Sequence, residues 1–178
     1  MKTIEYRDIV DRTDWDSGPW DGEPDKVQWQ DPDTGLPCLA VRNQAMGNWC
    51  GYVGVTPGHP FFGLHYDDEK VDVQVHGGLT FCGPCRENDK EHGICHRPDP
   101  GEPDHVWWLG FDCNHAFDLA PGMVATLKKY AAGFGKFPRD EYRDLRYVTR
   151  ECAELAKQLT LAEALDTVTK AAKIVLKK

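Results

Sequence analysis

The hydrophobic periodicity of this chain changes once, near residue 118. Before that point, β-branched and aromatic residues alternate or cluster in the segments 38–43, 50–55, 71–76 and 105–113, a pattern typical of strands. After it, apolar residues recur every three or four positions, as in amphipathic helices. The length of 178 residues suits one domain with one core. We therefore predict a single loop-rich α+β domain over 1–178, in which C-terminal helices (119–178) cover an antiparallel β-sheet (1–118).

Three helices are expected after residue 118. The first begins near Pro121, because proline suits a first helical turn, and the second occupies 140–159. Thr160 and Glu163 have capping-box spacing, which predicts the start of a separate last helix. Its apolar stripe, which we expect to pack on the rest of the domain, is formed by Leu161, Leu165, Val168 and Val175.

Charge and composition exclude several classes of protein. The net charge of −8 argues against a general nucleic-acid or membrane-surface binder. No apolar run approaches the roughly 20 residues that span a bilayer, and the first residues lack the apolar core of a secretory signal. A cytoplasmic protein is therefore expected. Its seven cysteines are expected to be reduced thiols that bind metal or lie buried, and disulfides are the less favoured interpretation.

A cysteine- and histidine-rich loop is the first candidate site. Cys82 and Cys85 flank Gly-Pro, and they are followed by His92, Cys95 and His96. Two thiolates at this spacing can bind one zinc ion, and a second pair of ligands completes a tetrahedron. The alternatives are a thioredoxin-like redox pair, which the polar residues after Cys85 disfavour, and a loop of idle or buried thiols.

Two histidine motifs form the second candidate site. His76 precedes Gly77 and Gly78, and glycines let the backbone approach a ligand closely. Asp112 and His115 lie three residues apart at the end of an expected strand, where they can bind a metal or pair an imidazole with a carboxylate. We expect His76, Asp112 and His115 to share one catalytic site. The next acid in the series, Asp118, precedes Pro121 so closely that we expect it to cap a helix instead.

Aromatic residues are concentrated before residue 110. Trp49, Tyr52 and Trp108 are candidates to stack on a small ligand beside Gly77 and Gly78. The alternative is that these side chains belong to the core.

Four segments resemble a family of uncharacterised proteins from bacteria and their phages. They are GNWCGYVGV (47–55), VHGGLTF (75–81), VWWLGFDCNH (106–115) and YRDLRYV (142–148). The resemblance covers about Trp15 to Leu159 and implies an intracellular protein, but it brings no assigned activity and no catalytic residues.

Together, these patterns favour an intracellular zinc-binding protein that hydrolyses a small phosphorylated or nucleotide-like substrate, because metal-ligand residue types are so concentrated in the middle of the chain. Two alternatives stay open. One is a non-catalytic protein that captures a nucleotide-like ligand, and the other is an interaction domain with structural zinc.

Overall fold

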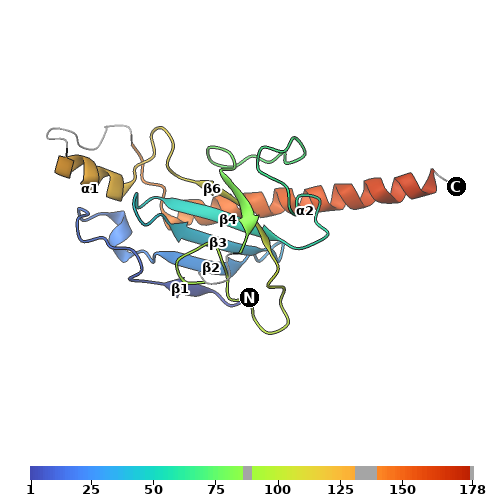
Figure 1. Cartoon of the computed structure of the whole chain (residues 1–178), viewed down its shortest axis with the longest axis horizontal. Coiled ribbons are helices and arrows are strands. Elements are labelled where there is room, and N and C mark those ends of the chain that lie inside the picture. The colour runs from blue at the N-terminus through green and yellow to red at the C-terminus, as the bar shows by residue number, and fades with distance from the viewer. Residues whose placement is uncertain (86–89, 131–139, 177–178) are drawn as a thin grey trace.

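The computed structural model describes residues 1–85, 90–130 and 140–176. A six-stranded antiparallel sheet has the strand order β1-β2-β3-β4-β6-β5, and the long helix α2 runs across one of its faces (Figure 1). The strands are β1 (Ile4–Tyr6), β2 (Lys26–Gln30), β3 (Pro37–Arg42), β4 (Trp49–Val55), β5 (Phe81–Pro84) and β6 (Trp107–Asp112). The remaining elements are the short 3-10 helix η1 (Pro19–Gly22), α1 (Pro121–Tyr130) and α2 (Leu145–Val175). The predicted α+β class is confirmed.

Strand alternation divides the core between the two faces of the sheet. Cys38 and Ala40 of β3 face α2, whereas Leu39 and Val41 belong to a second cluster with Trp108 on the opposite face. The helix approaches the sheet closely because β4 has a glycine at the crossing point. A Cβ atom on Gly51 would lie 2.8 Å from the Cys152 sulfur.

The first half of α2 packs as its periodicity predicts. Asp144 caps the helix by accepting a hydrogen bond from the Tyr147 amide at 2.8 Å. The helix residues that are buried against the sheet are Val148, Cys152, Leu155, Ala156 and Leu159.

A buried polar network ties the start of α2 to the sheet. The Glu23 carboxylate accepts hydrogen bonds from Arg42 at 2.8 Å, Trp49 at 3.1 Å, the Tyr142 hydroxyl and the Leu145 amide at 2.8 Å. The Arg42 side chain is completely buried, and its guanidinium lies 4.3 Å from the centroid of the Trp49 ring. This arrangement pairs the buried cation with a carboxylate and an aromatic face.

The predicted break at Thr160 was wrong. One continuous helix covers Leu145–Val175, and the Thr160 hydroxyl donates to the Ala156 carbonyl at 3.0 Å. A threonine that bonds back by four residues stays inside a helix, and no glycine or proline interrupts the surrounding sequence.

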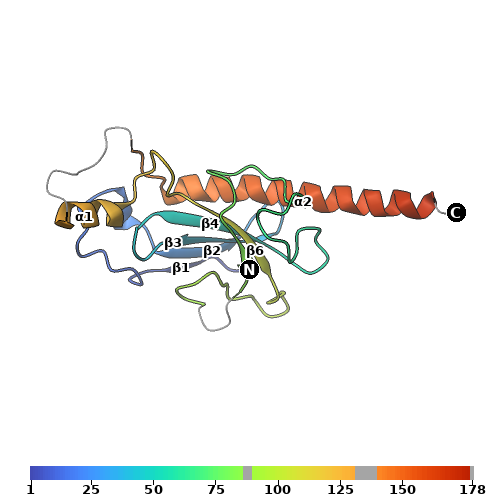
Figure 2. The same cartoon turned by 45° about the horizontal axis from the view of Figure 1, so that its top comes forward.

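The predicted packing of the last apolar stripe was also wrong. α2 extends past the edge of the sheet (Figures 1 and 2), and its last fully buried residue is Leu159. Beyond it, Leu161 and Leu165 are each 59% exposed and Val168 is 67% exposed.

The segment 71–76 is not a strand of the sheet. It is extended and lies against α2, where the Gln74 amide donates to the Gln158 side chain at 2.7 Å and Gln158 donates back to the Gln74 carbonyl at 2.8 Å. The predicted alternation nevertheless places three valines on the core side, namely Val71, Val73 and Val75. A helix side chain thus replaces a neighbouring strand as the hydrogen-bond partner of this backbone.

Candidate functional site

Asp118 lies at the centre of a cluster of polar side chains beside α2. Its side chain is 1% exposed and accepts three hydrogen bonds, from His76 Nε2 at 2.6 Å, the His115 amide at 3.0 Å and Arg143 Nε at 3.0 Å. Burial alone raises the pKa of this carboxyl, but the hydrogen bonds from His76, the His115 amide and Arg143 outweigh it and hold the pKa of Asp118 below its ordinary value. Asp118 is therefore a carboxylate that can only accept hydrogen bonds.

His76 is held from two sides. Its amide donates to Glu151 Oε2 at 3.1 Å, and the hydroxyl of Tyr147, one helical turn earlier on α2, lies 2.9 Å from its Nδ1. Because the Asp118 carboxylate requires a proton on Nε2, neutral His76 has an unprotonated Nδ1 that accepts from Tyr147. Asp118, His76 and Tyr147 therefore form a chain of hydrogen bonds like that of a carboxylate–histidine–hydroxyl triad.

Two arginines stack on Tyr147. The Arg143 guanidinium lies 4.9 Å and the Arg150 guanidinium 5.1 Å from the centroid of its ring. Burial raises the pKa of the Tyr147 hydroxyl, Glu151 adds to this effect, and Arg143 opposes it. The hydroxyl therefore keeps its proton at neutral pH unless a base such as His76 removes it.

His115 lies beside the chain of hydrogen bonds formed by Asp118, His76 and Tyr147. The centroids of its ring and of the His76 ring are 5.6 Å apart, and its side chain is 35% exposed. Its Nε2 atom is buried without a hydrogen-bond partner among the described residues. The ring occupies the place that a side chain on Gly77 would take, since a Cβ atom there would lie 1.9 Å from His115 Nε2. The glycine that we expected to admit a ligand thus admits His115, whereas a Cβ atom on Gly78 would meet nothing within 4 Å.

The structure brings the three predicted catalytic residues together, since Asp112 Oδ1 lies 3.8 Å from His115 Nε2. Asp112 also accepts from the Asn114 amide at 3.0 Å, as a residue that caps a turn does. The helix-capping role of Asp118 was wrong, because its carboxylate contacts His76 and Arg143 instead. Sequence reasoning missed Arg143 and Tyr147 as site residues, although both lie in the segment YRDLRYV that was singled out for its resemblance.

The aromatic ligand wall was wrong. Trp49 and Trp108 are fully buried and Tyr52 is 8% exposed, so all three pack in the core. The exposed aromatic ring near the site is instead Phe117, which is 59% exposed and has a φ of 74°. A bulky residue in the left-handed region is uncommon and often marks a functional position.

The predicted zinc ligands lie outside this cluster and do not form one metal-binding group. Cys85 and Cys95 form a disulfide, which contradicts the expectation of reduced thiols there, while Cys82 is a free thiol whose pKa is raised to about 11 by burial. His96 is buried, with its ring centroid 5.4 Å from that of Trp108, and burial lowers its pKa. His92 is exposed. Within 1–85, 90–130 and 140–176, no group of three or more possible metal ligands is found, and zinc binding stays a prediction.

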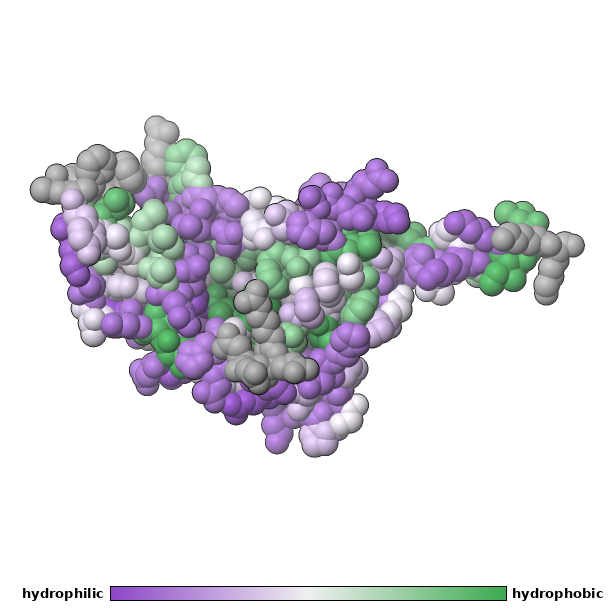
Figure 3. All heavy atoms as spheres, in the orientation of Figure 1, coloured by the Kyte–Doolittle hydropathy of each residue, from purple (hydrophilic) through white to green (hydrophobic). Residues whose placement is uncertain are grey.

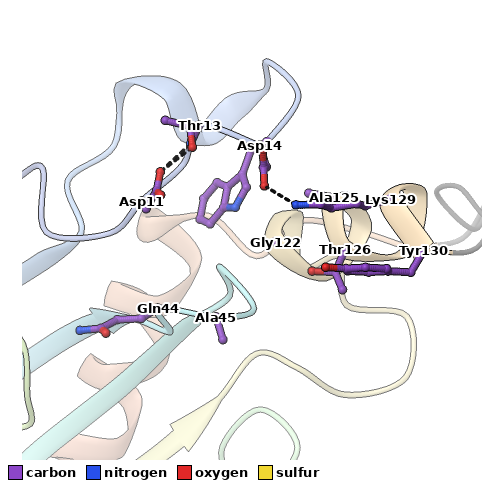
Figure 4. A pocket seen from close by; sticks show the side chains of 11 residues that line it. Asp11, Thr13, Asp14, Gln44, Ala45, Gly122, Ala125, Thr126, Lys129 and Tyr130 are labelled. Atoms are coloured by element: carbon purple, nitrogen blue, oxygen red, sulfur yellow. Dashed lines mark hydrogen bonds and ion pairs between the residues drawn. The ribbon is translucent and has the colours of Figure 1, made fainter.

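Among the clefts elsewhere on the surface are two that adjoin helices. One of about 200 Å³ lies between the N-terminal segment and α1, where Lys129 Nζ and Asp14 Oδ2 are 3.7 Å apart (Figure 4). The other, of about 710 Å³, follows the first turns of α2 and is lined by residues that include Arg150, Asp31 and Asp33. Arg150 therefore lines this second cleft and also stacks on the ring of Tyr147.

A scan against protein-family models and searches of curated proteins and of solved structures found no match to this chain. The resemblance to a family of bacterial and phage proteins therefore stays a prediction. In the described part of the chain, no helix has the length and apolar character needed to cross a membrane.

Proposed function

We propose that this protein is a hydrolase that acts on a small phosphorylated or nucleotide-like substrate at Tyr147. The observation that carries the proposal is the hydrogen-bond chain from Asp118 through His76 to Tyr147, next to two arginines. A hydroxyl paired with an oriented histidine is an activated nucleophile. Guanidinium groups bind phosphate oxygens and stabilise the charge that develops on them.

The proposed reaction has two steps. In the first, the Tyr147 oxygen attacks phosphorus while its proton passes to His76 Nδ1, and the leaving oxygen takes a proton from the imidazolium form of His115. In the second, water attacks the phosphotyrosine and gives a proton to His115, while the Tyr147 oxygen recovers its proton from His76. One water is consumed and every side chain returns to its starting state.

The nucleotide-like character of the proposed substrate rests on Phe117. Phe117 lies between His115 and Asp118 in the sequence, and its ring is exposed. Its backbone carbonyl accepts a hydrogen bond from the Glu141 amide at 2.8 Å. This hydrogen bond fixes the backbone of Phe117, and the exposed ring offers a surface on which a base can stack. We expect Phe117→Gly, which keeps the positive φ accessible, to raise the KM for a nucleoside monophosphate and to leave that for ribose 5-phosphate unchanged.

The test is hydrolysis of bis(p-nitrophenyl) phosphate, p-nitrophenyl phosphate and a panel of nucleotides. Tyr147→Phe keeps the ring and removes only the nucleophile, so kcat should fall by at least about 100-fold. Tyr66→Phe is the matched control, because Tyr66 is 40% exposed and outside the site, and its kcat should equal that of the wild type. Titration calorimetry with the same nucleotides runs in parallel.

Three outcomes contradict the proposal. Full activity of Tyr147→Phe removes the nucleophile from the mechanism. Nucleotide binding without turnover assigns the site to ligand capture. A wild-type protein that neither hydrolyses nor binds any member of the panel leaves the cluster with a structural role only.

A further inference from the structure

A cleft of about 710 Å³ lies beside the first turns of α2, and its volume is within the range of about 300–1,000 Å³ that is typical of small-molecule sites. α2 contacts β3 and β4, and β2, the next strand of the sheet, lies beyond the helix. The last turns of α2 stand clear of the body of the domain (Figure 3), so only its first half can form a cleft with the sheet. We call this space the α2 cleft.

Part of the lining of the α2 cleft is aromatic and apolar. Trp29 pairs with Cys38 in the sheet, and its ring packs at the border of the core cluster on the α2 side. From the helix come Leu145, Thr149 and Ala153, which follow one another at intervals of four residues and so form one row along α2. Tyr147 lies about 200° from Leu145 around the helix. The α2 cleft is therefore separate from the Tyr147 hydroxyl, and its lining suits an apolar group of a ligand.

The sheet side of the α2 cleft has a buried carboxylate with one free oxygen. Asp31 is 3% exposed, and its Oδ1 accepts hydrogen bonds from the Thr34 amide at 2.9 Å and the Thr34 hydroxyl at 2.8 Å. Its Oδ2 accepts none from any described residue and is not enclosed by protein atoms, so it opens into the cleft that Asp31 lines. The exposed Asp33 adds a second carboxylate nearby. A ligand that donates to Asp31 Oδ2 gains a charge-assisted hydrogen bond.

The helix side of the α2 cleft has two cations. Arg146 and Arg150 are four residues apart, so both side chains lie on the same side of α2. Arg150 stacks on Tyr147, and in the described part of the chain neither arginine forms an ion pair, with Asp31 and Asp33 included. Guanidinium groups bind carboxylates through paired hydrogen bonds. The cleft thus has unpaired charges of opposite sign on its two sides and an apolar surface between them.

We propose that the α2 cleft binds a short peptide with an apolar side chain, with the peptide ammonium group at Asp31 and its carboxylate at Arg146 and Arg150. A ligand with opposite charges at its two ends matches both sides of the cleft, whereas a nucleotide would bring its phosphate close to the carboxylates. In a free amino acid both charges are attached to one carbon atom. A dipeptide separates them by a peptide unit and can span two sides that no described ion pair joins. This proposal does not depend on the proposed hydrolase activity.

The test is titration with the dipeptide alanyl-phenylalanine, followed by the indole N–H signal of Trp29 in proton–nitrogen NMR spectra. The Kd should be about 0.1–1 mM, the scale expected for a ligand of this size. Two blocked forms of the same dipeptide each lack one charge, since N-acetylation removes the ammonium group and amidation removes the carboxylate. Each should bind at least about 10-fold more weakly, because one hydrogen-bonded ion pair is lost.

Replacement of one charged residue at a time assigns each end of the dipeptide. Asp31→Asn keeps an oxygen for Thr34 and removes the charge, so it should raise the Kd of alanyl-phenylalanine at least about 10-fold and leave that of the N-acetyl form unchanged. Arg146→Met should weaken the free dipeptide in the same way and not its amide. Asp72→Asn is the matched control, because Asp72 is an exposed carboxylate outside the cleft, and it should bind like the wild type. The thermal midpoint of each variant checks folding.

Four results overturn the proposal. They are a wild-type protein whose Trp29 signal does not respond to alanyl-phenylalanine, an N-acetyl form that binds as tightly as the free dipeptide, an Asp31→Asn variant that weakens both forms equally, and loss of dipeptide binding in Tyr147→Phe. Tyr147→Phe removes the proposed nucleophile and should bind the dipeptide like the wild type. Failure of the hydrolase proposal therefore leaves the dipeptide titration unchanged, and the two proposals are tested separately.

Discussion

Gly77 is the residue whose replacement best tests the described arrangement of the two histidines. It has a φ of +65°, and a Cβ atom there would lie 1.9 Å from His115 Nε2. The left-handed conformation costs alanine about 1–2 kcal/mol, and displacing a packed ring adds about 1–3 kcal/mol. We therefore expect Gly77→Ala to lower the free energy of unfolding by about 2–5 kcal/mol.

The neighbouring glycine provides the matched control. Gly78 also has a positive φ, of +87°, but a Cβ atom there would meet nothing within 4 Å. Gly78→Ala should therefore show only the conformational cost, about 1–2 kcal/mol. The same reduction in unfolded-state entropy applies to both substitutions, so it does not affect their comparison.

The clash can be isolated with a double-mutant cycle measured by urea denaturation. In a His115→Ala background the ring is absent, and Gly77→Ala should cost no more than Gly78→Ala. The coupling energy between positions 77 and 115 should be about 1–3 kcal/mol. An equal cost of Gly77→Ala in both backgrounds would refute the packing of His115 against this glycine.

Three further measurements test other parts of the structure. Arg42→Met removes a buried cation and leaves the Glu23 carboxylate without it, so the free energy of unfolding in urea should fall by about 3–5 kcal/mol. The pKa of Asp118 is lower in the folded state than in the unfolded state, so the ionised carboxylate stabilises the fold above about pH 4. This stabilisation is lost as pH falls through the pKa of the folded state, so the wild type should lose more stability between pH 5 and pH 3 than Asp118→Asn. Cys85→Ser should lower the free energy of unfolding of the oxidised protein by about 2–3 kcal/mol, given the separation of 10 residues from Cys95, and should leave that of the reduced protein unchanged. Zinc that is found in the reduced wild type and lost in Cys85→Ser would instead support the predicted metal loop.

The local pattern of apolar residues predicted the elements that are strongly patterned or that pair with a neighbour in the sequence. Three of the predicted strands correspond to β3, β4 and β6, and α1 begins at Pro121 as expected. The four-residue strand β5 was missed, since it contains Gly83 and Pro84 and pairs only with β6 at the edge of the sheet, where proline is tolerated. Periodicity identified the valines of 71–76 as core-facing, but it could not distinguish pairing with a strand from pairing with Gln158.

The candidate site was predicted only in part, because contacts between segments that are distant in the sequence complete it. His76, Asp112 and His115 were chosen because their residue types and flanking glycines stood out locally. Asp118 has the same local signals as a helix cap, and only the fold places it against His76. Tyr147 was not among the candidates, because the sequence does not reveal that the loop containing His76 follows this side of α2.

α2 contributes to the proposed catalytic site through the half of the helix that packs on the sheet. Tyr147 and Glu151 hold His76 from this half, whereas Leu165 lies beyond Leu159, the last fully buried residue of the helix, and is 59% exposed. The proposed catalytic site therefore does not depend on contacts of Leu165. Turnover by Leu165→Glu should equal that of the wild type. A loss of turnover in this variant would mean that the exposed half of α2 also orders Tyr147, through the one helix that connects them.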